Sequence, residues 1–103
     1  MTTDNRRAPR HRCKIRARIA AGDHAFNGHV IDVSMTGFRL LTDEIVDIWT
    51  GMDIETHTHE LGVTKAKVCW RSPGRLGAKV DDSVDMKPRL EAYRKFYNSD
   101  ALG

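Results

Sequence analysis

Apolar side chains occupy every second position from Cys13 to Ile19, and basic side chains fill the positions between them. This period of two is typical of a β-strand with one face on a core and the other in water. Further short apolar runs follow, separated by residues that favour turns. The pattern predicts six strands, at about residues 13–19, 28–31, 38–41, 52–57, 63–71 and 75–80.

Turn-forming residues separate the expected strands. Gly22-Asp23 and Asn27-Gly28 predict a reversal after the first strand, and Ser72-Pro73-Gly74 predicts a turn before the last. The polar segment 32–37 predicts a bend between the second and third strands. Residues 42–45 predict at most a short helical turn, because a glycine follows soon afterwards.

The spacing of apolar residues changes near the end of the chain. Leu90, Tyr93, Phe96 and Tyr97 lie one, three or four positions apart, which predicts a helix with one apolar face. Six short strands followed by one helix predict a mainly β fold. We expect a small six-stranded antiparallel β-barrel, with the C-terminal α-helix lying against it or across one end.

Residues 1–12 carry almost no apolar side chains, so they cannot bury enough surface to offset the entropy lost on ordering. We expect a flexible basic tail there and a single folded domain over residues 13–103. Seven Lys and Arg residues and no acid lie between positions 6 and 18, whereas six acids and no Lys or Arg lie between positions 40 and 64. This asymmetry favours an anionic partner, which is a nucleotide, a nucleic acid or a membrane surface.

Several classes of function lack support in the sequence. No apolar run approaches the roughly 18 residues of a membrane span, and the N-terminus lacks the apolar core of a secretory signal, so we expect a cytoplasmic protein. Cys13 and Cys69 lie far apart and are interpreted as reduced, buried thiols. His57 and His59 lack a third metal ligand nearby. Motifs of serine hydrolases, P-loop proteins and zinc proteases are missing, so we expect neither catalysis nor a metal.

Two polar motifs point to a binding site. The first is Arg6-Arg7-Ala8-Pro9-Arg10, which has the pattern RRxxR, and the second is Asp32-Val33-Ser34-Met35-Thr36-Gly37, which has the pattern DxSxxG. Taken alone, the first motif indicates a solvated basic tail and the second a turn that caps its own backbone. Their occurrence together, one before the first strand and one after the second, is far more specific than either alone.

With these two motifs in this order, the chain resembles the PilZ domain family. Weaker similarity continues through Val68-Cys69-Trp70 and the strand 75–80, so the resemblance covers roughly the whole chain. The pair His11-Arg12 departs from the family pattern, in which apolar residues often follow the first motif, but it leaves the motif positions intact. The resemblance implies a six-stranded barrel with a C-terminal helix that binds the bacterial second messenger cyclic di-GMP.

The resemblance also implies a ligand site, made of Arg6, Arg7, Arg10, Asp32, Ser34 and Gly37. Guanidinium groups suit phosphates and the O6/N7 edge of guanine, and a carboxylate can accept hydrogen bonds from guanine N1–H and N2. Gly37 is expected to supply a positive φ angle or to let the ligand approach the backbone. Arg39 and Trp70 are candidates for a place beside the ligand, although an exposed strand residue and a core residue are the simpler interpretations.

The function implied by the resemblance is a single-domain receptor for cyclic di-GMP that needs no cofactor. Ligand binding would order the basic tail, change the surface and so regulate an unidentified partner protein in motility, adhesion or exopolysaccharide production. Two alternatives are a small basic β-barrel that binds nucleic acid and a PilZ-like module that binds no ligand. Few of the seven aromatic residues fall on expected exposed strand faces, which argues against nucleic acid, and the intact motifs argue against a module without ligand.

Overall fold

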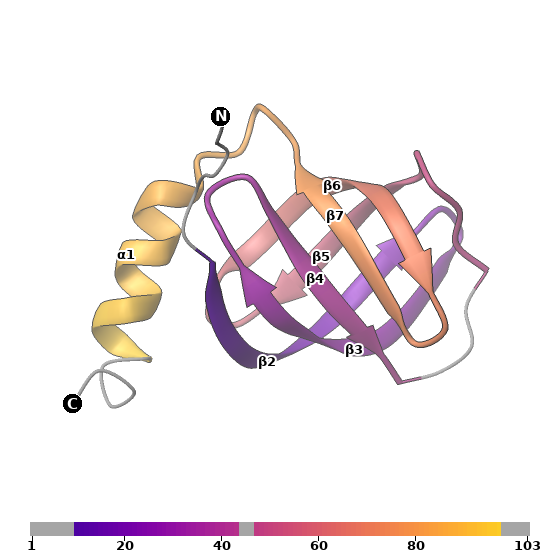
Figure 1. The fold of residues 1–103 in the computed structure, drawn as a ribbon. Helices are drawn as coiled ribbons and strands as arrows, with labels where there is room; N and C mark the ends of the chain where they lie inside the picture. The colour runs from indigo at the N-terminus through magenta and orange to yellow at the C-terminus, as the bar shows by residue number, and fades with distance from the viewer. Residues whose placement is uncertain (1–9, 44–46, 98–103) are drawn as a thin grey trace, which may run out of the picture.

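A computed structural model describes residues 10–43 and 47–97 of the chain (Figure 1). Six strands and one helix follow one another: β2 (His11–Ala21), β3 (His24–Val33), β4 (Gly37–Thr42), β5 (Asp53–Thr58), β6 (Gly62–Ser72), β7 (Arg75–Val80) and α1 (Met86–Phe96). The strands form a closed barrel in the order β2-β3-β4-β7-β6-β5, and every neighbouring pair is antiparallel. The prediction of a mainly β, six-stranded barrel with a C-terminal helix is confirmed.

The alternation that predicted the first strand also explains how the barrel is filled. Ile15, Ala17 and Ile19 of β2 point inward and are buried, while the basic residues between them are exposed. All the other strands add inward apolar side chains, so the interior forms one continuous core. Burying such side chains is the main term that stabilises a domain of this size.

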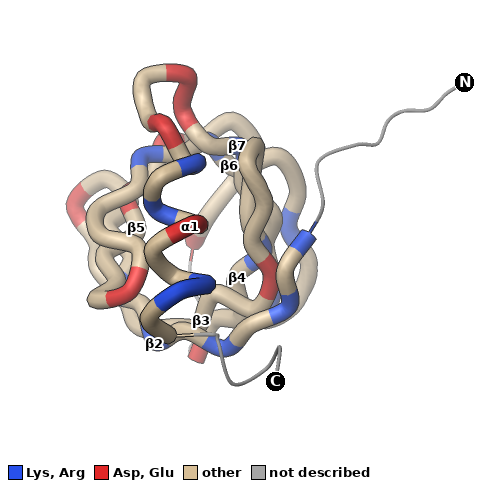
Figure 2. Tube along the Cα trace, turned by 90° about the vertical axis from the view of Figure 1, so that its left-hand side faces the viewer, with Lys and Arg blue, Asp and Glu red and all other residues tan. Residues whose placement is uncertain are grey.

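Helix α1 lies across one end of the barrel, as the two perpendicular views show (Figures 1 and 2). Met86, Leu90 and Tyr93 are its buried residues. The Asp85 side chain caps the helix by accepting a hydrogen bond from the Lys87 amide at 3.1 Å. Of the predicted apolar face, Leu90 and Tyr93 are buried but Phe96 and Tyr97 are exposed. The prediction is therefore correct for the first half of that face only. No helix in the described ranges is long and apolar enough to cross a membrane.

Several predicted boundaries are wrong, and the bend expected over residues 32–37 is confined to residues 34–36, because β3 runs to Val33 and β4 begins at Gly37. β2 begins at His11, two residues before the expected start. β3 begins at His24, because Gly22, with φ +60°, and Asp23 alone form the turn, and Asn27-Gly28 lies inside the strand. Gly28 is needed there for space, since a Cβ atom at this position would lie 2.4 Å from the Leu41 carbonyl oxygen. The short helical turn expected at 42–45 falls largely outside the described residues.

The two cysteines occupy different environments. Cys13 is half-buried and its Sγ donates to the Val30 carbonyl oxygen at 3.4 Å. Burial, with smaller contributions from the charges of Asp32 and Glu60, raises the pKa of the Cys13 thiol to about 12, so it stays protonated. Cys69 is exposed, which corrects the expectation of two buried thiols. Alternation along β6 places Cys69 on the outer face with Lys65 and Lys67, and the register shift between Val68 and Trp70 then turns Trp70 outward as well.

Candidate functional site

The sheet ladder aligns the predicted site residues in one row across the barrel. Asp32 of β3 pairs with Arg12 of β2 on one side and with Arg39 of β4 on the other. Arg39 pairs in turn with Gly77 of β7, and Gly77 pairs with Trp70 of β6. Residues 7 to 38 positions apart in the sequence thus become neighbours because antiparallel pairing places them in register.

Register shifts interrupt the ladder at this row. They occur between Arg12 and Ile15 where β2 meets β3, between Val30 and Asp32 where β3 meets β4, and between Val68 and Trp70 where β6 meets β7. A β-bulge changes the direction of the side chains that follow it, and bulges are frequent beside functional sites. Here they accompany a buried carboxylate, Asp32, and an exposed indole, Trp70, in the same row.

The Asp32 carboxylate holds two guanidinium groups. Arg10 Nη1 donates to Asp32 Oδ1 at 2.8 Å, and Arg39 Nη2 donates to Asp32 Oδ2 at 2.7 Å. Asp32 is only 2% exposed, whereas the two arginine side chains are 56% and 40% exposed. Burial alone would raise the pKa of Asp32, but the bonds and charges of Arg10 and Arg39 outweigh it and lower that pKa. The cluster therefore carries a net positive charge that reaches solvent.

Ser34 and Gly37 shape the bend between β3 and β4. The Ser34 hydroxyl accepts hydrogen bonds from the Thr36 and Gly37 amides, both at 3.2 Å, and the Ser34 amide donates to the Gly37 carbonyl at 2.8 Å. Gly37 does not have a positive φ, so the first of its two expected roles is wrong. A Cβ atom at Gly37 would lie 2.6 Å from the Ala78 carbonyl oxygen, so glycine permits the close approach of β7.

A shallow hollow of about 370 Å³ opens beside the paired arginines. Its lining is Arg10, Thr36, Gly37, Phe38, Arg39, Cys69, Trp70, Gly77, Ala78 and Lys79. The lining contains three cationic side chains and no carboxylate. Trp70 is 42% exposed, and a Cβ atom at Gly77 would lie 2.2 Å from its indole Nε1, so the indole rests on the glycine. Positive charge beside a flat aromatic surface suits an anionic ligand that has planar rings.

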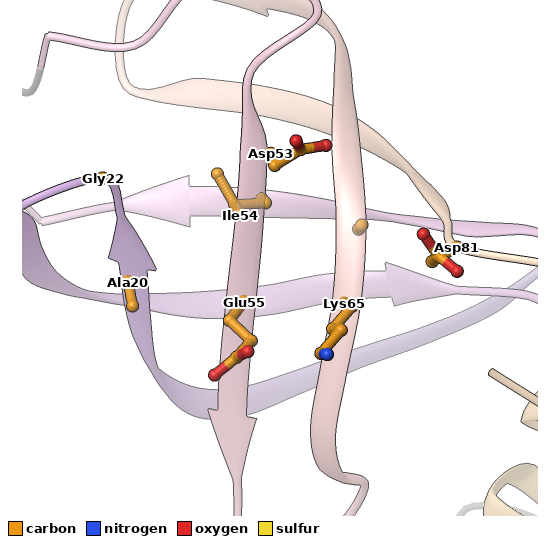
Figure 3. Close-up of a pocket in the computed structure, with 8 residues that line it drawn as sticks. Ala20, Gly22, Asp53, Ile54, Glu55, Lys65 and Asp81 are labelled. Atoms are coloured by element: carbon orange, nitrogen blue, oxygen red, sulfur yellow. The ribbon is translucent and has the colours of Figure 1, made fainter. Parts of the chain in front are cut away.

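A second hollow, of about 430 Å³, has the opposite character (Figure 3). Asp53, Glu55 and Asp81 line it together with a single cation, Lys65. Three carboxylates would repel an anion, so the smaller hollow is the better site for an anionic ligand. No group of His, Cys, Asp and Glu side chains in the described part of the chain is arranged to hold a metal ion.

The structure brings together most of the residues that the sequence singled out. Arg10, Asp32, Arg39 and Trp70 surround or line one hollow, while Ser34 and Gly37 build the bend next to it. Arg6 and Arg7 lie outside the described residues. The expectation that Trp70 packs in the core is wrong, because it lies on the outer surface.

Sequence reasoning missed Gly77 and Lys79 as parts of the hollow. Both belong to the strand that was correctly expected over residues 75–80. Their role depends on β7 lying next to β4, an arrangement that no local pattern in the sequence specifies. Only the alternation of exposed Lys79 with buried neighbours marked it as an outward residue.

Comparison with known proteins defines the class. The PilZ domain family matches residues 4–95, which is most of the chain, and the protein belongs to that family. A crystal structure of the PilZ domain of CeSA from a cellulose-synthesizing bacterium has a TM-score of 0.65 to this fold at 16% sequence identity, and the match covers 89% of this chain and 98% of that one. At this identity the likeness demonstrates a shared fold. No curated protein matches the sequence.

Proposed function

We propose that this PilZ domain binds cyclic di-GMP in the hollow beside Asp32 and acts as a receptor that regulates a partner protein in trans. The observation that carries the proposal is the gathering of Arg10 and Arg39 on one buried carboxylate, at the edge of a hollow that also contains Trp70. This combination offers positive charge, a hydrogen-bond acceptor and a flat apolar surface within one site. Membership of the PilZ family supports the choice of ligand.

The chemistry of the ligand matches these groups. Cyclic di-GMP carries two phosphate charges and two guanines. Arginine can bond a phosphate or the O6/N7 edge of guanine with two parallel hydrogen bonds, and its planar face can stack on a base. Trp70 offers the guanine a stacking surface, an interaction worth roughly 1–3 kcal/mol per base. Lys79 adds a third positive charge to the same hollow.

Binding at Asp32 requires an exchange of partners, because both of its carboxylate oxygens already accept hydrogen bonds from arginine. Arg10 is the more exposed of the two arginines and is the group that we expect to leave. The N1–H and N2 groups of guanine would replace it on Asp32, and the released guanidinium would turn to a phosphate or to the O6/N7 edge. The buried carboxylate keeps its hydrogen bonds throughout, which keeps the cost of the exchange low.

The remaining motif residues take two different roles in this proposal. Arg6 and Arg7 would contact the phosphates, since they extend the basic motif that ends at Arg10. Ser34 and Gly37 would act by shaping the bend that holds Asp32 in place. Rearrangement of the residues around Arg10 would then alter a surface that a partner recognises, in the bacterial cytoplasm and in motility, adhesion or exopolysaccharide production.

Isothermal titration calorimetry of the full chain with cyclic di-GMP tests the proposal. Arg10→Ala and Asp32→Ala should each weaken binding about 10- to 100-fold, the loss expected for a charge-assisted contact of roughly 1.5–3 kcal/mol. Lys87→Ala, on the exposed face of α1, should leave the affinity unchanged. Absence of binding at micromolar protein would refute the proposal and leave a PilZ module without this ligand. Equal affinity for cyclic di-AMP would refute guanine recognition at Asp32.

A further inference from the structure

Four exposed basic side chains lie at alternate positions along the outer face of β2, and we call them the basic stripe: Arg12, Lys14, Arg16 and Arg18. Alternate residues of a strand are about 6.7 Å apart, so the stripe is roughly 20 Å long. Apart from the bulge at residues 13–14, β2 pairs with β3 along this length, which fixes the spacing of the side chains. The stripe is therefore a regular row of positive charges on a rigid support.

The charges of the basic stripe are not neutralised by the rest of the fold. None of the four side chains forms an ion pair within residues 10–43 and 47–97. Arg18 Nη1 donates to the neutral Asn27 Oδ1 at 3.0 Å. Like charges so close together repel one another, and neither the core nor the nucleotide hollow uses these side chains. The grouping is thus unfavourable for folding and favourable for binding an anionic partner.

The two ends of the stripe differ in charge. Arg12 pairs in register with Asp32, so this end adjoins the cluster of Arg10 and Arg39. At the other end, the Asp43 amide donates to the carbonyl of Asn27, the residue that pairs with Arg18. Glu55 of β5 pairs with Ala20, two residues beyond Arg18. Carboxylates therefore flank the stripe at the Arg18 end, and additional cations flank it at the Arg12 end.

This polarity distinguishes between classes of partner. A nucleic acid or an anionic bilayer is negative throughout, so it would be attracted at one end of the stripe and repelled by Asp43 and Glu55 at the other. The exposed large apolar residues of the described chain lie outside β2 and β3, so the stripe has neither a stacking platform for bases nor a side chain to insert into lipid. A protein surface can match both the positive end and the mixed end.

We propose that the basic stripe docks an extended acidic segment of the partner protein, with carboxylates at every second residue. Such a segment repeats at the same spacing of about 6.7 Å, and the three arginines can each bond a carboxylate with two hydrogen bonds. The inference rests on the proposed receptor function, because it names the chemistry of the protein that the receptor regulates. The partner would lie next to the bound nucleotide at the Arg12 end.

Fluorescence anisotropy at low salt, with the full chain, tests this docking. The probe is a labelled peptide of about 7 residues that alternates glutamate with threonine, long enough to span the stripe without extending past its Arg18 end. Reversing two charges with Lys14→Glu and Arg16→Glu together should weaken its binding about tenfold or more. The matched control is Lys87→Glu with Arg94→Glu on the exposed surface of α1, which changes the net charge equally and should leave the affinity near that of the wild type.

Each further outcome either supports or overturns the docking of the acidic peptide on the basic stripe. A peptide alternating lysine with threonine should not bind the wild type, and binding as tight as that of the acidic peptide would overturn the proposal. An equal loss of peptide affinity in both double variants would overturn the assignment of the binding site to the basic stripe, because net charge alone would then explain binding. Tighter binding of single-stranded oligothymidine or of phosphatidylserine vesicles than of the acidic peptide would overturn the choice of partner.

Binding of cyclic di-GMP separates this proposal from the proposed receptor function. Both double variants should still bind cyclic di-GMP. If the wild type binds the peptide selectively but not the nucleotide, the receptor function fails and the docking surface stands.

Discussion

Two guanidinium groups approach one carboxylate at Asp32, and both of them reach solvent while the carboxylate does not. This difference in burial decides what each side chain contributes. An exposed guanidinium that loses its partner regains water, whereas a buried carboxylate that loses a donor remains unsatisfied. Asp32 is thus fixed in place by the barrel, and the arginines are the groups that can move without a large cost.

The ionisation of Asp32 should make stability depend on pH. Its pKa in the folded protein is lowered by Arg10 and Arg39, so the unfolded chain, with a pKa of about 3.9, binds the proton more readily. The stabilisation is fully present well above about pH 4 and is lost as the pH falls through the folded pKa. Urea denaturation from pH 6 to pH 3 should show a smaller loss of stability in Asp32→Asn than in the wild type. An identical pH dependence in the two proteins would contradict this.

Gly37 and Gly77 should respond differently to the same substitution. Gly37→Ala places a methyl group against the Ala78 carbonyl, a backbone atom that cannot move without shifting β7, and should lower the free energy of unfolding by about 1–3 kcal/mol. In Gly77→Ala the obstructing atoms belong to the Trp70 side chain, which can swing away. This variant should lose less stability but shift the fluorescence of Trp70 and weaken nucleotide binding. Chemical denaturation and emission spectra distinguish the two, and a larger stability loss for Gly77→Ala would refute the comparison.

At the scale of the elements, α1 is attached to the barrel by its buried side chains and by one arginine. Arg89 Nη1 donates to the carbonyl oxygens of Leu61 and Val63 and to Thr64 Oγ1, so it joins the helix to the hairpin between β5 and β6. None of the residues in this contact lines the hollow beside Asp32. This separates the positioning of α1 from the chemistry of the site.

Removing the Arg89 side chain should loosen α1. Arg89→Ala deprives three acceptors of a charged donor and should cost about 1–3 kcal/mol of stability. Arg94→Ala removes an exposed arginine from the same helix and should cost well under 1 kcal/mol. Hydrogen exchange of the α1 amides should accelerate in the first variant only. Unchanged protection in Arg89→Ala would show that the buried face alone holds the helix.

Over the whole molecule, sequence patterns predicted what depends on local periodicity. Strict alternation predicted the first strand, and the three- and four-residue spacing predicted the helix. Trp70 was misplaced because Ala66, Val68 and Trp70 alternate in the sequence, while a bulge at Cys69 reverses the direction of the last side chain. Likewise, Asn27-Gly28 has the composition of a turn, but its glycine serves close packing against β4.

The motifs predicted which residues form the site but not how they contact one another. The hydrogen bond between Arg39 and Asp32 depends on the register of β3 with β4, which includes a shift between Val30 and Asp32. The place of Lys79 in the hollow depends on β7 lying beside β4. The packing of the whole core determines which distant strands pair, so no single stretch of sequence specifies this pairing.

Closure of the barrel should have one weak seam. β2 pairs with β5 only through Arg18, Ile19 and Ala20, whereas β3 pairs with β2 over nearly its entire length. Local opening occurs where the fewest backbone hydrogen bonds must break, so the seam between β2 and β5 should open before the other strand pairs. Hydrogen exchange should therefore be faster for the amides of β5 that face β2 than for those shared by β3 and β4. Cyclic di-GMP should leave this difference intact, because its proposed hollow spans β4, β6 and β7 rather than the seam. Earlier exchange between β4 and β7 would contradict the assignment of the weak seam.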